Sequence, residues 1–393
     1  MLARLRPALA GLLVAFAVAG LFLALRERTS NTTPDARRDD AEVTLGNESV
    51  PQQEVRPSEN SAPQPRRAGR LPSTAKVVGQ TIIGRLDVGS PDPELMGRVR
   101  RGEVGGVILF APPPASNATV ASALRRLQRE AESGGNPGLL VAVDQEGGEV
   151  KRLPGPPRMS PPDFQTAPRA ANEGDATGQY LSSLGVNIDL APVLDVAHPG
   201  SAIAGRTLGT TPQAVATLGR AFSRGLESQG VAATGKHFPG LGAANINTDV
   251  GHATIALPPE KLLEEARPFI AANTPLVMVS NARYLALDPK APAVFSRGIT
   301  MGLLRSKLHF RGLVVTDDLE ADAIRADFGP GQAAESALKA GVDLLLFARP
   351  GGRSADAFKQ VLASASTDFV LRRNLRRAYQ AVLALKRRLR LAD

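Results

Sequence analysis

The chain has 393 residues, with 47 Lys and Arg against 38 Asp and Glu, and it contains neither Cys nor Trp. The absence of Cys excludes disulfides, a thiolate nucleophile and a Cys-based metal site. The formal charge of +9 comes from the ends of the chain, since residues 1–70 sum to +2, residues 372–393 to +7 and residues 71–371 to zero. With 4% aromatic residues and no interleaving of basic and aromatic side chains, we do not expect nucleic-acid binding.

An apolar run without charge, Ala8–Leu25, lies near the start of the chain and has two arginines on each side. A helix of 18 residues is roughly 27 Å long, which is just enough to cross the core of a bilayer. We favour an uncleaved transmembrane signal anchor over residues 1–28 rather than a signal peptide, because no small-x-small site precedes a suitable mature start. Residues 29–75 are rich in Ser, Thr, Asn, Pro and charge, which predicts a disordered linker. The folded part, residues 76–393, is then expected on the extracytoplasmic side of the cell membrane, held there as a single-pass protein.

Short apolar runs alternate with longer helical patterns from residue 76 onward. The runs are Gln80–Gly84, Gly106–Phe110, Leu139–Val143, Asn187–Leu190, Val231–Thr234, Leu276–Val279, Leu313–Val315 and Asp343–Phe347. Continuously apolar strands separated by helices are typical of a parallel sheet that helices cover. Eight such units predict a single closed (β/α)8 TIM-like barrel. An open doubly wound sheet is the alternative, but no Gly-rich dinucleotide fingerprint follows the first run.

Polar side chains follow these runs at the points where the strands are expected to end. They are Asp144 and Arg152 after the third run, Asp189 and Asp195 at and after the fourth, Lys236 and His237 after the fifth, Asn281 after the sixth, and Asp317 and Asp318 after the seventh. A barrel places its active site at the carboxyl ends of its strands. The sequence therefore predicts a functional rim rather than scattered surface charge.

The rim is rich in groups that bind hydroxyls. We single out Asp144, Arg152, Arg206, Lys236, His237 and Asn281 as candidate substrate-binding residues. Such a set suits a neutral polyol, that is, a sugar. Only four His are present and no Gly-Lys-Ser/Thr loop occurs, so we expect neither a metal nor another cofactor.

Cleavage of a glycoside needs a carboxylate on one side of the anomeric carbon and a proton donor on the other. Asp317 is the candidate nucleophile because it would project from a rigid strand end; the alternative is helix capping, and the neighbouring Asp318 allows one Asp to cap and one to react. His252, which we expect to pair with Asp249 in the Gly-rich segment 240–252, is the candidate proton donor, with an ordinary loop His as the alternative.

Six motifs in this order resemble glycoside hydrolase family 3, and most closely its single-domain bacterial β-N-acetylhexosaminidases. They are Asp144–Arg152, Ala191–Asp195, Gly205–Gly209, Lys236–Gly240, Met278–Arg283 and Val314–Leu319, and the resemblance covers about residues 76–390. It implies a TIM-like barrel and cleavage with retention of anomeric configuration, through a glycosyl-enzyme on an Asp that by motif position is Asp317. It also implies that Asp144, Arg152, Arg206, Lys236 and His237 bind the sugar.

One segment departs from the family pattern. The family's Lys-His-Phe-Pro-Gly-His-Gly has Leu241 in place of its second His, and the pair Asp249-Val-Gly-His252 contains one more intervening residue than the family's Asp-Ser-His. His252 could reach the substrate by a different path of the loop, the donor could lie elsewhere, or turnover could have been lost.

We therefore expect a retaining glycoside hydrolase that removes terminal β-linked N-acetylhexosamine from glycans, with peptidoglycan-derived glycans among the candidate substrates. The alternatives are a β-glucosidase of the same family and a surface glycan-binding protein without turnover. The sequence gives no oligomeric state. Apolar residues at helical spacing in Phe369–Leu391 predict a last helix that packs on the barrel. Its arginines are expected on a solvated face, and the alternative is that they contact an anionic wall polymer or lipid surface.

Overall fold

The computed structural model of the protein describes residues 72–89, 92–111 and 115–393. Its centre is a sheet of eight parallel strands in the order β12-β9-β7-β6-β3-β2-β1-β13. A bridge between Val315 and Leu344 joins the two end strands and closes the sheet into a barrel. The strands are β1 (Ile82–Asp87), β2 (Gly106–Phe110), β3 (Leu140–Val143), β6 (Ile188–Asp189), β7 (Ala232–Phe238), β9 (Leu276–Val279), β12 (Leu313–Thr316) and β13 (Leu345–Leu346).

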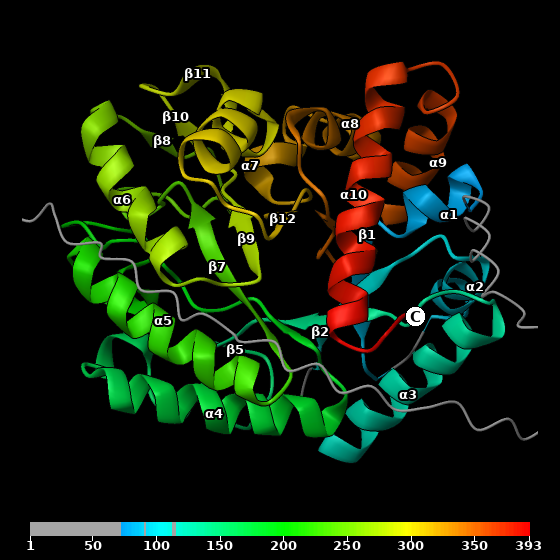
Figure 1. Cartoon of the computed structure of the whole chain (residues 1–393), viewed down its shortest axis with the longest axis horizontal. Coiled ribbons are helices and arrows are strands. Elements are labelled where there is room, and N and C mark those ends of the chain that lie inside the picture. The colour runs from blue at the N-terminus through cyan, green and yellow to red at the C-terminus, as the bar shows by residue number, and fades with distance from the viewer. Residues whose placement is uncertain (1–71, 90–91, 112–114) are drawn as a thin grey trace, which may run out of the picture. The chain divides into compact units, whose positions relative to one another are not determined.

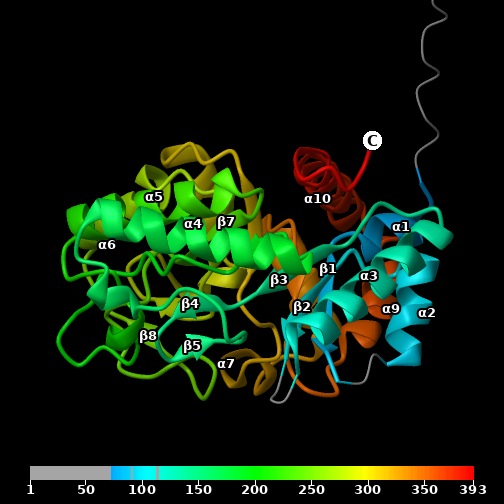
Figure 2. The same ribbon diagram turned by 90° about the horizontal axis from the view of Figure 1, so that it is seen from below.

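Ten α-helices accompany these strands in the described residues. They are α1 (Thr74–Gly79), α2 (Pro93–Arg101), α3 (Asn117–Ser133), α4 (Ala167–Leu184), α5 (Pro212–Ser228), α6 (Pro259–Ala271), α7 (Asp322–Arg325), α8 (Pro330–Ala340), α9 (Ser354–Ser364) and α10 (Phe369–Arg388). Figures 1 and 2 show α4, α5 and α6 gathered on one side of the barrel and α1, α2, α3 and α9 on the other. Each of the eight predicted runs overlaps one barrel strand, which confirms the predicted barrel.

Local sequence determines where several helices begin. Ser116, Thr166 and Thr211 precede α3, α4 and α5, and each side chain accepts a hydrogen bond from the backbone N–H three residues later. These bonds satisfy donors that a helix leaves free in its first turn.

The barrel strands are buried on both faces, which explains why they read as continuous apolar runs. One group of apolar side chains fills the barrel, among them Ile83, Leu140 and Met278. The other face of each strand packs against the helices, as Val107 and Val314 do.

Helix α10 closes the amino-terminal end of the barrel. Its Val382 and Leu385 join the apolar group that fills the barrel, and the Leu391 carbonyl accepts a hydrogen bond from the Gly138 N–H, just before β3. Leu371 and Leu375 are also buried, so the predicted packing of this helix is confirmed. Because the amino-terminal end is plugged, the carboxyl ends of the strands are left to form the site.

Additional short strands lie at the carboxyl end of the barrel. A hairpin of β4 (Gln145–Gly147) and β5 (Val150–Lys151) follows β3, and a small sheet combines β8 (Thr254–Ile255), β10 (Arg283–Tyr284) and β11 (Asp288–Pro292). Four short 3-10 or π segments complete the described elements: η1 (Pro161–Asp163), η2 (Ala204–Arg206), η3 (Ala293–Phe295) and η4 (Gly298–Lys307).

The predicted membrane-spanning helix requires a correction. Within the part of the chain that the structure describes, no helix combines the length and the apolar character needed to cross a membrane. The segment 1–28 lies outside the described residues, as does the predicted linker except for residues 72–75. An apolar run of 18 residues is at the lower limit of a spanning length, so its hydropathy alone did not justify a transmembrane helix.

Candidate active site

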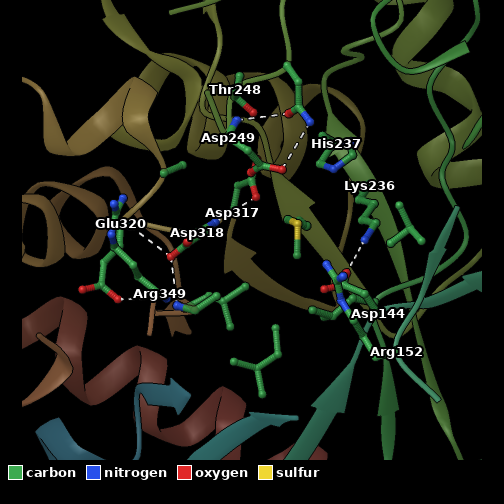
Figure 3. A pocket seen from close by; sticks show the side chains of 18 of the residues that line it. Asp144, Arg152, Lys236, His237, Thr248, Asp249, Asp317, Asp318, Glu320 and Arg349 are labelled. Carbon is green, nitrogen blue, oxygen red and sulfur yellow. Dashed lines mark hydrogen bonds and ion pairs between the residues drawn. The ribbon is translucent and has the colours of Figure 1, made fainter. Parts of the chain in front are cut away.

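A cavity of about 870 Å³ opens at the carboxyl ends of the barrel strands (Figure 3). The candidate residues that line it are Asp144, Arg152, Arg206, Lys236, His237, Asp249 and Asp317. Two candidates, Asn281 and His252, are not among its lining residues. Asn281 is buried, and its side-chain amide donates a hydrogen bond to the Asp318 carbonyl at 2.7 Å.

A buried ion cluster forms one wall of this cavity. The Lys236 ammonium lies 2.7 Å from an Asp144 oxygen and 2.6 Å from Glu146 Oε1. The Arg206 guanidinium donates two hydrogen bonds to the carboxylate of Glu146, at 2.8 and 2.9 Å. Burial alone would raise the pKa of Glu146, but the charges of Lys236 and Arg206 outweigh it and lower the pKa to about 2. Glu146 is therefore a fixed anion that holds two sugar-binding candidates in place.

Asp195 fixes the ring of His237. Its carboxylate accepts hydrogen bonds from the backbone N–H of His237 at 3.0 and 3.1 Å and from that of Leu241 at 2.6 Å, and it lies 2.7 Å from His237 Nδ1. An anion at Nδ1 favours the tautomer with its proton on that nitrogen. The other ring nitrogen, Nε2, is thereby available as an acceptor.

Asp317 follows β12 and is 8% exposed. Its backbone N–H donates to the Val279 carbonyl, and its carboxylate accepts a hydrogen bond from the Asp318 N–H at 2.8 Å. Burial raises the pKa of Asp317, and Asp249 adds to this, whereas His237 opposes it. A carboxylate so enclosed is held in one position at the base of the cavity.

Asp318 has a different environment from its neighbour. Its carboxylate accepts hydrogen bonds from the backbone N–H groups of Glu320 and Ala348, both at 3.0 Å. Burial raises its pKa to about 7 despite these bonds. Asp318 thus ties the loop after β12 to the end of β13, whereas the Asp317 carboxylate accepts its backbone hydrogen bond from the adjacent Asp318 N–H.

The loop between β7 and β8 places Asp249 and His252 in different surroundings. The carbonyls of Thr248 and Asp249 accept hydrogen bonds from the backbone N–H groups of Ala323 and Asp322, which follow Asp317 along the chain. Asp249 points into the cavity beside Asp317 (Figure 3). The His252 side chain is 54% exposed, with its Nε2 3.7 Å from Asp327, and lines a separate small cavity. The structure does not bring His252 into the site or pair it with Asp249.

Further side chains of this cavity were not singled out from the sequence. Arg85 lies with its guanidinium 3.6 Å from the centre of the Phe110 ring, and Arg152 lies 5.2 Å from the same ring. Arg349 also lines the cavity. A charged residue inside the apolar strand Ile82–Asp87 was the available signal for Arg85, since barrel strands otherwise carry apolar side chains.

Comparison with known proteins decides the family. Residues 80–384 match the model described as glycosyl hydrolase family 3 N terminal domain. The chain belongs to glycosyl hydrolase family 3. Family membership makes it an O-glycosyl hydrolase, in agreement with the resemblance of its motifs.

Similar proteins of this family come from fungi and bacteria. An uncharacterized secreted glycosyl hydrolase of Arthroderma benhamiae is 35% identical over 295 residues, which are 70% of this chain and 82% of the relative. A β-hexosaminidase of Pseudomonas aeruginosa is 35% identical over 264 residues, 63% of this chain and 75% of the relative. The structure of a β-N-acetylhexosaminidase from Beutenbergia cavernae has a TM-score of 0.75 and 32% identity, covering 80% of this chain and 98% of that one. A family 3 β-N-acetylglucosaminidase from Paenibacillus has a TM-score of 0.77 and 33% identity, covering 82% of this chain and 63% of that one.

These findings also correct the predicted localisation. A single-pass membrane protein was expected, but no described helix could span a membrane, and the family relative from Arthroderma benhamiae is described as secreted.

Replacing Glu146 by Gln tests the ion cluster. Losing one partner of a buried ion pair costs about 3–5 kcal/mol, so the free energy of unfolding should fall by that order at pH 7. Because folding lowers the pKa of Glu146 from 4.5 to about 2, its stabilising effect is complete above about pH 4.5 and is lost as the pH falls toward 2. Urea unfolding of the wild type and the Glu146→Gln variant should give a difference in the free energy of unfolding that is constant from pH 8 to 5. This difference should become smaller below pH 5.

The matched control is Glu149→Gln, a nearby exposed carboxylate. It should change the free energy of unfolding by less than about 0.5 kcal/mol. If the free energies of unfolding of the wild type and the Glu146→Gln variant differ by the same amount down to pH 3, the described role of the Glu146 carboxylate is contradicted.

Proposed function

We propose that this family 3 enzyme hydrolyses terminal β-linked N-acetylhexosaminides with retention of configuration, with Asp317 as the nucleophile. The observation that carries the proposal is the position of Asp317 at a strand end, buried at the base of a cavity whose wall is the cluster of Asp144, Lys236 and Arg206. The names of the β-hexosaminidase relatives support the sugar class.

The proposed reaction has two steps at Asp317. Its carboxylate attacks the anomeric carbon, the bond to the leaving-group oxygen breaks, and that oxygen receives a proton from a second group. Water then attacks the same carbon, gives its proton to the second group, and releases Asp317 as a carboxylate. His237, whose ring Asp195 orients, opposes the effect of burial on the pKa of Asp317 and so favours the ionised form that this attack requires.

We assign the second group to Asp249 in place of His252. Retaining enzymes use two carboxyl groups that face each other across the scissile bond, about 5 Å apart. Asp249 and Asp317 line the same cavity, and the backbone bonds of Thr248 and Asp249 tie the loop to the segment that carries Asp317. A rigid link of this kind maintains the geometry that proton transfer requires.

Glycans with more than one sugar are the proposed substrates. The cavity volume of about 870 Å³ lies in the upper part of the roughly 300–1,000 Å³ range of small-molecule sites. Arg85, Phe110 and Arg349 line it in addition to the ion cluster, which leaves room for a group beyond the sugar that is cleaved. Peptidoglycan-derived oligosaccharides belong to this proposed class.

Asp317→Asn tests the nucleophile. The amide cannot form the glycosyl-enzyme, so the turnover of an aryl β-N-acetylglucosaminide should fall by about 10⁴-fold or more, as expected when a covalent route is removed. Asp175→Asn on the exposed surface of α4 is the matched control and should retain wild-type kcat. Wild-type protein that turns over an aryl β-glucoside but not the N-acetylglucosaminide would refute the sugar class, and an active Asp317→Asn variant would refute the nucleophile.

Asp249→Ala and His252→Ala distinguish the two candidate donors. A lost proton donor should slow the cleavage of a poor leaving group by about 10²–10⁴-fold and that of a nitrophenol much less. We expect this pattern for Asp249→Ala, with azide restoring turnover as the β-glycosyl azide, and near wild-type kinetics for His252→Ala. If His252→Ala shows the leaving-group dependence and Asp249→Ala does not, the assignment to Asp249 is wrong.

A further inference from the structure

A second cavity, of about 430 Å³, lies outside the active site and shares no lining residue with it. Residues of β10, β11, η3 and α8 form its walls. Helix α8 and η3 are in contact, and β11 continues directly into η3, so the walls belong to one packed unit of the fold.

Cationic side chains dominate the lining of this cavity. The cations are Arg283, Lys290, Arg297 and Lys339, and the single acidic residue is Asp327. Lys339 is paired with Asp368 at 2.8 Å. Among the residues that the structure describes, the other three cations have no carboxylate within ion-pair distance. Four cations gathered around a single carboxylate repel one another, and a bound anion would reduce that cost.

Arg283 adds a buried group that lacks a partner. Its Nε is shielded from solvent and makes no hydrogen bond to the described residues. A buried donor without an acceptor costs about 1–3 kcal/mol, and the cost is larger when the donor is charged. Such groups in folded proteins are normally satisfied, which points to an acceptor supplied by a ligand.

An apolar surface lies beside these cations. Phe295 and Phe328 line the same cavity and pack edge to face, with their ring centres 4.8 Å apart. The cavity therefore offers charge on one part of its wall and aromatic carbon on another. This combination suits a ligand that carries an acidic group on an apolar or ring-shaped body.

We propose that this cavity is a second binding site, for a ligand whose carboxylate or phosphate group is held by Arg283, Lys290 and Arg297. The ring or apolar part of the ligand lies against Phe295 and Phe328. The site is independent of the proposed catalytic reaction, since neither Asp317 nor Asp249 lines it.

Calorimetry with inorganic phosphate and, separately, with benzoate tests the proposal on the full chain. The cavity variant is Lys290→Gln with Arg297→Gln, and the matched control, Arg125→Gln with Arg126→Gln on α3, removes the same charge from exposed positions. We expect one saturable site in wild type and control, and affinity at least about tenfold weaker in the cavity variant, since hydrogen bonds to charged groups are lost. Tighter binding of benzoate would identify a carboxylate ligand, and tighter binding of phosphate a phosphorylated one.

Saturating N-acetylglucosamine separates this site from the catalytic cavity and should leave the binding of both probes unchanged. Retained glycosidase activity shows that the cavity variant is folded. The proposal is overturned if neither probe binds wild type saturably, if the cavity variant binds as wild type does, or if N-acetylglucosamine displaces the probe. Loss of the proposed glycosidase function alone would leave these binding results unaffected.

Discussion

The carboxylate of Glu146 is buried between two cations, Lys236 and Arg206, that come from different parts of the barrel rim. Lys236 is supplied by β7, Arg206 by η2, and Glu146 by the β4–β5 hairpin after β3. Each of these charges would be costly to bury alone, so each requires the others. The cluster joins β7, η2 and the β4–β5 hairpin at one point and determines where this wall of the cavity stands relative to β12 and Asp317.

Further contacts extend from this wall of the cavity to Asp317. Asp195 orients His237 next to Lys236, and His237 in turn opposes the effect of burial on the pKa of Asp317. On the other side of Asp317, backbone bonds connect the β7–β8 loop to Asp322 and Ala323. Asp317 is thus positioned from two directions, by charges from the strands and by main-chain hydrogen bonds from the loop.

The barrel could be predicted because its strands are buried on both faces. Strands of this kind have continuously apolar sequences, such as Leu139–Val143 and Leu276–Val279. Because a barrel places its active site at the carboxyl ends of its strands, Asp144, Lys236 and Asp317 could also be predicted to lie at one rim. Glu146 could not be identified as the second partner of Lys236, because the inward turn of Glu146 depends on the hairpin that follows Asp144. The separate placement of Asp249 and His252 could not be predicted from local sequence, since backbone hydrogen bonds to residues about seventy positions later determine the path of their loop.

Covalent trapping tests the central claim most directly. A fluorinated N-acetylglucosaminyl fluoride forms a glycosyl-enzyme faster than water releases it, so the sugar stays on the nucleophile. After proteolysis, mass spectrometry should find one labelled peptide, with the sugar on Asp317. A label on Asp318 or Asp249, or turnover of the reagent without any labelled protein, would contradict the account.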